Sequence, residues 1–287
     1  MRIIQLISIY LIFLTSCNGG GDKDTLIIIK TSFGEMKAVL HDQTPKHKEN
    51  FIKLVKSGFY DSLIFHRVIE GFMIQGGDPD SRNAKPGQPL GSGGPGYTIP
   101  AEFNRSLIHK KGALSAARMG DNQNPQKESS GSQFYIVQGK KYTNAELTTD
   151  LNKLASSIGN YLESTGDTIL RNELINLYQT NQDAYLEKLM SLKPTMETAL
   201  GTTFSRDFSA DRVEVYTTTG GVPHLDDGYT VFGKVVEGLE IIDKIASQST
   251  DSRDRPLQDI IMEINLEEVP KKEITEKYGY QYALESN

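Results

Sequence analysis

The segment 65–78 constrains the fold of this chain more tightly than any other stretch. It reads F-H-R-V-I-E-G-F-M-I-Q-G-G-D and brings together a guanidinium (Arg67), an amide (Gln75) and two large apolar side chains (Phe72 and Met73). Successive side chains of an extended chain point to opposite faces, and the three glycines permit backbone conformations that other residues resist. The segment therefore predicts an apolar surface beside one cation, without a nucleophile or a cluster of metal ligands.

The rest of the chain reads mainly as antiparallel β structure, because strand-like runs dominate and no strand–helix–strand repeat appears. A hairpin is expected over 25–41, with its turn at Phe33-Gly34. A helix should follow, with Thr44 as its N-cap, Pro45 at the first helical position and Gly58 as its stop. A second amphipathic helix is expected over 239–246. The remaining expected strands lie at 97–103, 112–117, 131–137, 213–218, 229–235 and 260–266.

Between 140 and 212 the apolar residues change from a period of two to a period of about 3.6. Leu147, Leu151, Leu154 and Ile158, for example, fall on one helical face. This region predicts a helical insertion of three or four helices, interrupted late by Pro194 and Gly201. The insertion is expected beside the mouth of the site, either as a wall or client-binding platform or as a tolerated decoration. The last residues, 271–287, are expected to form a loosely held tail.

Composition excludes some classes of function. The 287 residues are 37% hydrophobic and 24% charged, which suits a soluble globular body, and a net charge of -6 argues against a nucleic-acid partner. The five histidines are scattered without ligand spacing, so we expect no metal and no cofactor. The G-x-G-x-x-G pattern at Gly91, Gly93 and Gly96 lacks the flanking strand and helix of a dinucleotide site and is interpreted as a structural loop.

The N-terminal region resembles that of a bacterial lipoprotein. Residues 1–16 contain an apolar run of signal-peptide length, and Leu14-Thr15-Ser16-Cys17 resembles a lipobox. Cleavage before Cys17, the only cysteine, would make it the lipidation site, with 17–24 as a tether. A secreted protein with one unpaired thiol is the alternative. The lipoprotein interpretation predicts a location in the bacterial cell envelope.

Three blocks in order carry a family resemblance: 65–78, the segment G-S-Q-F-Y-I-V at 131–137, and H-L-D-D-G-Y-T-V-F-G at 224–233. Together they resemble the cyclophilin-type peptidyl-prolyl cis-trans isomerases. The resemblance implies a closed eight-stranded antiparallel barrel capped by two helices. It divides the chain into a barrel domain of 25–139 and 213–270, interrupted by the insertion 140–212. It also implies that the partners are proline-containing peptides and unfolded proteins, and the chain is expected to be a monomer.

The same resemblance implies the roles of particular residues. Arg67 and Gln75 match the catalytic pair, and His66 is expected to be a neutral, hydrogen-bonded structural residue. The implied substrate-binding residues are Phe72, Met73, Ala117, Arg118, Gln133, Tyr135, His224, Leu225 and Tyr229. Tyr135, His224, Tyr229 and the pair Ala117-Arg118 depart from the residues usual in the family. His224 stands where a tryptophan tied to cyclosporin binding is common, so strong cyclosporin binding is not expected.

The predicted function is isomerisation of X-Pro bonds in envelope or secreted proteins. A non-catalytic peptide-binding or chaperone module with the same pocket is the alternative. A hydrolase fits less well, because no serine lies in a nucleophile-elbow pattern.

Overall fold

The computed structural model describes residues 22–283. The predicted signal segment 1–16 and the predicted lipidation site Cys17 lie outside the described residues, as does most of the predicted tether. No helix within 22–283 combines the length and the apolar character that crossing a bilayer requires.

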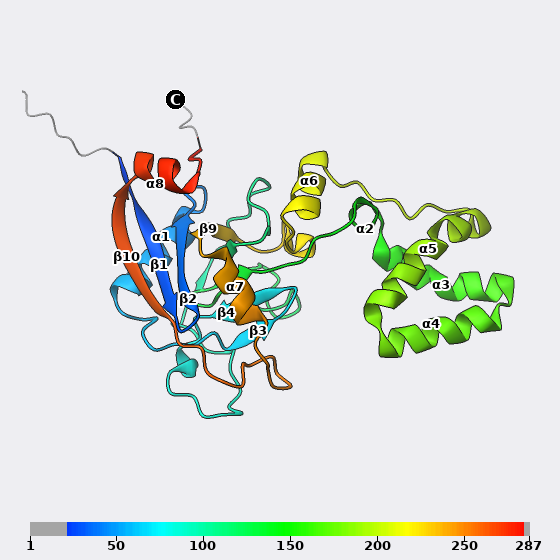
Figure 1. Cartoon of the computed structure of the whole chain (residues 1–287), viewed down its shortest axis with the longest axis horizontal. Helices are drawn as coiled ribbons and strands as arrows, with labels where there is room; N and C mark the ends of the chain where they lie inside the picture. The colour runs from blue at the N-terminus through cyan, green and yellow to red at the C-terminus, as the bar shows by residue number, and fades with distance from the viewer. Residues whose placement is uncertain (1–21, 284–287) are drawn as a thin grey trace, which may run out of the picture.

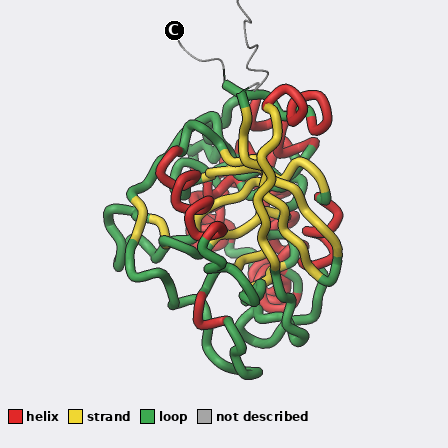
Figure 2. The backbone as a smooth tube through the Cα atoms, turned by 90° about the vertical axis from the view of Figure 1, so that its left-hand side faces the viewer, coloured by secondary structure: helices red, strands yellow, loops and turns green. Residues whose placement is uncertain are grey.

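One antiparallel sheet of eight strands forms the body of the protein, in the order β10-β1-β2-β9-β6-β8-β4-β3 (Figures 1 and 2). Its strands are β1 (Lys23–Thr31), β2 (Gly34–Leu40), β3 (Arg67–Ile69), β4 (Met73–Gly76), β6 (Ala113–Ala116), β8 (Phe134–Val137), β9 (Val231–Glu237) and β10 (Glu263–Pro270). A second, two-stranded sheet pairs β5 (Thr98–Ile99) with β7 (Ser129–Ser130). The mainly antiparallel β architecture is confirmed, with shifted boundaries. β1, for example, begins inside the predicted tether 17–24.

Closure of the sheet into a barrel stays a prediction. The edge strands are β3 and β10, and the segments that precede them meet at one isolated bridge between Ile64 and Ile261. The Phe65 amide donates to the Ile260 carbonyl at 2.9 Å beside this bridge. Within residues 22–283, these edges approach each other without a continuous ladder.

The two expected capping helices are α1 (Pro45–Lys56) and α7 (Leu239–Ala246). Their apolar stripes enter the main core as predicted, and each fully buried isoleucine or phenylalanine contributes about 1.5–3 kcal/mol. Thr44 is the N-cap residue of α1 and Pro45 its first residue, as predicted. The Thr44 side chain makes no capping bond to α1, because its hydroxyl instead donates to the His41 carbonyl at 3.3 Å.

The predicted insertion contains α2 (Asn144–Thr148), α3 (Leu151–Thr165), α4 (Thr168–Thr180) and α5 (Gln182–Leu200), and α6 (Ala210–Thr218) follows. Helices α3, α4 and α5, here called the helix bundle, share their own buried cluster and extend away from the sheet (Figure 1). The expected interruption at Pro194 was wrong. Buried Leu189 and Met196 flank this proline, and their packing holds α5 continuous through it.

Residues 213–218 were predicted to be a strand, and they form the second part of α6. Val213, Val215 and Thr217 favour a strand by propensity, but tertiary contacts override that preference. The side chain of Tyr216 is fully buried, and its hydroxyl donates to Asp226 at 2.7 Å. The helical region therefore continues beyond 212, to Thr218.

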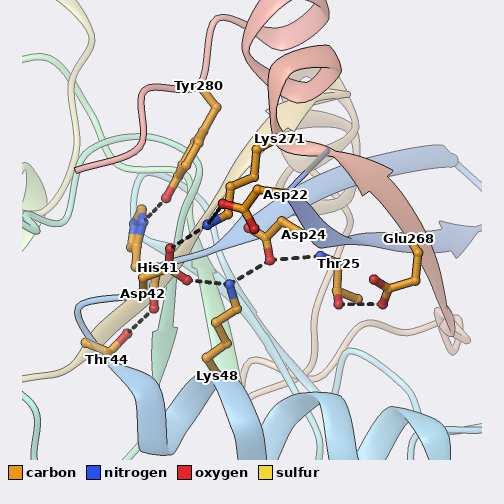
Figure 3. A network of polar contacts seen from close by, with 10 residues as sticks. All are labelled: Asp22, Asp24, Thr25, His41, Asp42, Thr44, Lys48, Glu268, Lys271 and Tyr280. Atoms are coloured by element: carbon orange, nitrogen blue, oxygen red, sulfur yellow. Dashed lines mark hydrogen bonds and ion pairs between the residues drawn. The ribbon is translucent and has the colours of Figure 1, made fainter. Parts of the chain in front are cut away.

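The expectation of a loosely held tail was wrong as well. Residues Lys271–Tyr278 form α8, whose Ile274 is fully buried beside β1 and β10. The Tyr280 hydroxyl bonds to His41 Nδ1 at 2.7 Å, and Lys271 pairs with Asp22 at 2.7 Å (Figure 3). These contacts tie the C-terminal segment to the start of the described chain.

Candidate active site

The register of three strands places the candidate site residues in one row. Arg67 on β3 lies opposite Gln75 on β4, which in turn lies opposite Tyr135 on β8. Directly opposed residues of an antiparallel pair project from the same face of the sheet. Met73, two residues before Gln75, shares that face because side chains alternate along a strand. The residues of segment 65–78 that share this face therefore form a continuous surface only together with β8.

The guanidinium of Arg67 is held from two sides. Its Nη1 donates to Gln75 Oε1 at 3.5 Å, and its Nε donates to Asp254 Oδ2 at 3.3 Å. Gln75 is fixed in turn, because its Nε2 donates to Gln133 Oε1 at 3.0 Å. These bonds use two of the five N–H donors of the arginine. The Arg67 side chain is 41% exposed, so it remains accessible to a ligand.

Arg67 borders a cavity of about 370 Å³, which falls within the usual range of ligand pockets. Apolar and aromatic side chains line one part of it: Phe72, Met73, Ala117, Tyr135, Leu225 and Tyr229. Polar groups and a loop line the rest: His66, Arg67, Gln75, Gln88, Pro89, Leu90, Gly91, Arg118, Asp251, Arg253 and Arg255. The arrangement places a fixed cation at the side of an apolar hollow. No residue of 140–212 lines this cavity, so the predicted wall is not found there.

Two predicted substrate-binding residues do not line this cavity. The Gln133 Nε2 donates to the carbonyl groups of Gly91 and Gly93, at 3.0 and 2.7 Å, and Gln133 borders an adjacent hollow. The His224 ring stacks on Phe72, with the ring centres 5.7 Å apart. Gln133 therefore braces the site, and the exposed His224 ring packs on Phe72, one of the side chains that line the cavity.

Arg118 lines the cavity, but its charge is already engaged. The guanidinium lies 4.3 Å from the centre of the Tyr229 ring, a cation–π contact. Its Nε donates to the Gly228 carbonyl at 2.8 Å, and its Nη1 pairs with Asp121 at 2.7 Å. Arg118 thus holds Tyr229 in place at the edge of the cavity.

His66 differs from the expectation in one respect. Burial lowers its pKa to about 4, so the ring is neutral at pH 7, as expected. Neither ring nitrogen has a hydrogen-bond partner among the described residues, so the expected hydrogen bond was wrong. The ring nevertheless lines the cavity beside Arg67.

The glycine-rich loop is held by the last residue of segment 65–78. Asp78 is fully buried, and its Oδ2 accepts hydrogen bonds from the amides of Gly91 and Gly93. Amides that are bonded in this way are not free to bind a phosphate, which agrees with the interpretation as a structural loop. Within 22–283, no group of three or more histidine, cysteine or acidic side chains lies close enough together to hold a metal ion.

Sequence reasoning missed three polar residues at this site. Asp254 contacts Arg67 across a separation of 187 residues, and the buried pair His109 and Asp226 lies behind Tyr135. Asp226 stands inside the third recognised block, next to Leu225, and this position is the one signal that could have identified it. No local pattern relates Asp254 to Arg67, because only the fold brings them together.

The sequence comparisons with known proteins agree on one family. A sequence model described as cyclophilin type peptidyl-prolyl cis-trans isomerase/CLD matches residues 26–160 and 195–266. The stretch between these two ranges lies within the helix bundle.

Several bacterial proteins are similar to this chain. A Staphylococcus aureus protein, provisionally named a peptidyl-prolyl cis-trans isomerase, is 32% identical over 82% of this chain and 93% of its own length. A Staphylococcus epidermidis protein with the same provisional name is 29% identical, over 86% and 94%. A Streptococcus pyogenes protein, provisionally named a bifunctional phosphatase/peptidyl-prolyl cis-trans isomerase, is 33% identical over 83% of this chain. The match spans only 37% of that protein.

Among solved structures, a Cryptosporidium parvum cyclophilin-type isomerase aligns with a TM-score of 0.49 and 21% identity. The alignment covers 87% of this chain and all of that one.

Proposed function

This chain belongs to the family of cyclophilin-type peptidyl-prolyl cis-trans isomerases, and from that premise we propose that Arg67 and the adjoining apolar hollow accelerate rotation about X-Pro bonds. Its substrates are proline-containing peptides and unfolded proteins. The observation that carries the proposal is the position of the Arg67 guanidinium, which borders the same cavity as Phe72, Met73 and Leu225.

Prolyl isomerisation has demands that this geometry meets. Amide resonance imposes a barrier of about 18–20 kcal/mol, and the uncatalysed reaction takes tens to hundreds of seconds. No covalent step or proton transfer is required. The enzyme must hold the proline ring while the carbonyl of the preceding residue rotates. It must also donate a hydrogen bond that stabilises the twisted C–N bond of the transition state, in which amide resonance is lost. The apolar side chains supply the first requirement, and Arg67 supplies the second.

The bonds to Gln75 and Asp254 prepare the arginine for this role. They orient the guanidinium before substrate binds, so little reorganisation is needed during the reaction. A charge-assisted hydrogen bond contributes about 1.5–3 kcal/mol, which corresponds to roughly 10- to 150-fold in rate. The remaining rate acceleration comes from exclusion of water by the apolar wall and from the fixed position of the proline ring.

The ion pair between Arg67 and Asp254 bears on the alternative, a peptide-binding module without useful turnover. The Asp254 carboxylate lies 3.3 Å from Arg67 Nε and offsets part of its charge. Both side chains are about two-fifths exposed, so solvent weakens this pairing, and exposed pairs contribute about 0–1 kcal/mol. The arginine is therefore free to serve a substrate at little cost.

The Arg67→Ala variant tests the proposal. Its kcat/KM on a short X-Pro peptide, measured in a protease-coupled assay, should fall by about 10- to 100-fold because the charge-assisted donor is lost. Arg67→Lys keeps the charge but loses the planar fork, and it should lie in between. Arg171→Ala, on the exposed side of α4, is the matched control and should behave as wild type. Equal rates for Arg67→Ala and wild type would favour the binding module.

We further propose that the protein acts in the bacterial cell envelope, held on a membrane by lipid on Cys17. The support is the lipobox-like sequence at 14–17, since the membrane anchor itself lies outside the described residues. Its clients are then envelope or secreted proteins that fold slowly at proline.

A further inference from the structure

Helix α6 lies behind the wall of the cavity and takes part in a buried series of polar contacts. The series runs from Tyr216 on α6 through Asp226 and His109 to Tyr135, whose ring lines the cavity. We call these four residues the polar chain. Its two ends come from the helical region and from the apolar hollow, so it connects an element outside the sheet with the site.

The first part of the polar chain fixes Asp226 from α6. The Tyr216 hydroxyl donates to Asp226 Oδ2 at 2.7 Å, and Arg212 Nη1 lies 3.5 Å from the same oxygen. Arg212 and Tyr216 are four residues apart, so they share one face of the helix. The Asp226 side chain is 3% exposed, and a carboxylate so deeply buried is costly unless it is paired and hydrogen-bonded. Asp226 therefore depends on α6.

The second part carries this constraint to Tyr135. Asp226 Oδ1 accepts a hydrogen bond from the His109 amide at 2.9 Å and lies 3.0 Å from His109 Nδ1. A carboxylate only accepts, so Nδ1 carries a proton, and the other ring nitrogen, Nε2, shares a hydrogen bond with the Tyr135 hydroxyl at 3.0 Å. His109 is fully buried and parallel to Tyr135, with the ring centres 6.1 Å apart.

The backbone near Gly221 leaves α6 little room to move. Gly221 bridges both Lys110 and Lys140, and the Val222 amide donates to the His109 carbonyl at 2.8 Å. A Cβ at Gly221 would lie 2.2 Å from that carbonyl oxygen and 2.7 Å from Tyr216 Cε1. The end of α6 and the segment 109–111 therefore pack against Gly221 and Val222, and the Leu225 amide donates to the Val222 carbonyl at 3.2 Å.

We propose that Tyr216 and Asp226 are positioning residues that hold Leu225 and the Tyr135 ring at the spacing that binds proline, so that α6 sets the affinity of the pocket for peptide. This deepens the proposed function and rests on it. In this arrangement the Tyr135 hydroxyl links the polar chain to the ring that lines the cavity. The ring holds proline in both the ground state and the transition state, so the polar chain should act on binding more than on turnover.

The Tyr216→Phe variant removes one hydroxyl and keeps the ring. Its KM for a short X-Pro peptide should rise about threefold to tenfold, with kcat within about twofold of wild type, because uniform binding is lost. The peptide Kd from an NMR titration should rise by the same factor. Tyr161→Phe, a buried tyrosine of α3 away from the cavity, is the matched control and should leave KM and Kd unchanged. Partial unfolding would instead lower the apparent kcat at constant KM.

The Tyr135→Phe background provides a second measurement. The link to His109 is absent there, so adding Tyr216→Phe should raise KM much less than it does in the wild-type background. Equal effects in both backgrounds would overturn the proposal, as would a KM and Kd for Tyr216→Phe equal to those of wild type. If wild type shows no turnover on any X-Pro peptide, the proposed function fails instead, and the peptide Kd of the same variants still decides whether α6 sets affinity.

Discussion

Arg67 shows how much of one side chain's role depends on distant residues. Its two partners are Gln75, eight residues away, and Asp254, 187 residues away. The first contact could be expected from a short β-hairpin. The second exists only because the loop before β10 returns to the site. Asp254 has a φ of 64°, in the left-handed region that asparagine and aspartate tolerate better than most residues.

His66 gives a prediction about pH. Burial is the main cause that lowers its pKa to about 4, the cations of Arg67 and Arg255 add to the shift, and Asp78 opposes it. The pKa in the folded state lies below that of the unfolded chain, near 6.5, so the unfolded chain binds more protons between these values. Stability should therefore fall as the pH falls from about 6.5 towards 4. At pH 5 the titration of this histidine alone should lower the free energy of unfolding by about 2 kcal/mol.

The measurement is urea unfolding at pH 7.5 and pH 5. His66→Leu should reduce the difference in unfolding free energy between the two pH values by about 2 kcal/mol, because the group that titrates is removed. The ring nitrogens make no hydrogen bonds to residues 22–283, so leucine leaves no partner within that range unsatisfied. The burial of His41 lowers its pKa to about 4 as well, so part of the pH dependence should remain. An unchanged difference would contradict this account of His66.

At the scale of elements, local punctuation explains which helices were predicted well. Helix α7 begins and ends at the predicted residues, and α1 begins at Pro45 as predicted. Helix α6 was missed because its β-branched residues favour a strand, while its helical form depends on contacts with Asp226 that a sequence window does not contain. Helix α8 was missed for a similar reason, since its one buried residue, Ile274, is surrounded by charged neighbours.

The docking of α8 can be tested by stability. Ile274→Ala should lower the unfolding free energy by about 2–4 kcal/mol, because it leaves a cavity where a fully buried side chain packs beside Leu26 and Val39. Ile261→Ala is the matched control. Its side chain is 57% exposed, so the change should be about 0.5 kcal/mol or less. Chemical denaturation of both variants measures the change in unfolding free energy. Equal decreases in the two variants would show that α8 is not packed as described.

At the scale of the whole molecule, the described residues form four separate hydrophobic clusters. The sheet and its capping helices share one, and the helix bundle has another. The bundle is joined to the sheet region through the segments around α2 and α6 (Figure 1). No residue of 140–212 lines the cavity. A client-binding platform formed by the insertion stays a prediction.

The proposed membrane anchor is a property of the whole chain. Cys17→Ala removes the sulfur that would carry lipid, so the protein should move from the membrane fraction to the soluble fraction when expressed in a bacterium. Gly21→Ala, four residues later, is the control and should stay with the membrane. Immunoblots of separated fractions measure the shift. A Cys17→Ala protein that remains in the membrane fraction would contradict the proposal.

The sequence by itself determined the family, the mainly antiparallel β class and the two capping helices. It also identified nine residues that line the cavity. These features follow from motifs, side-chain alternation and helix punctuation, all of which act over short distances along the chain. Only the tertiary structure decided the helical state of 213–218, the docking of α8 and the contacts of Arg67 and Tyr135 with Asp254 and His109. Those outcomes depend on which distant segments the strand register and the core bring together, and burial and hydrogen bonding between such segments outweigh local propensity.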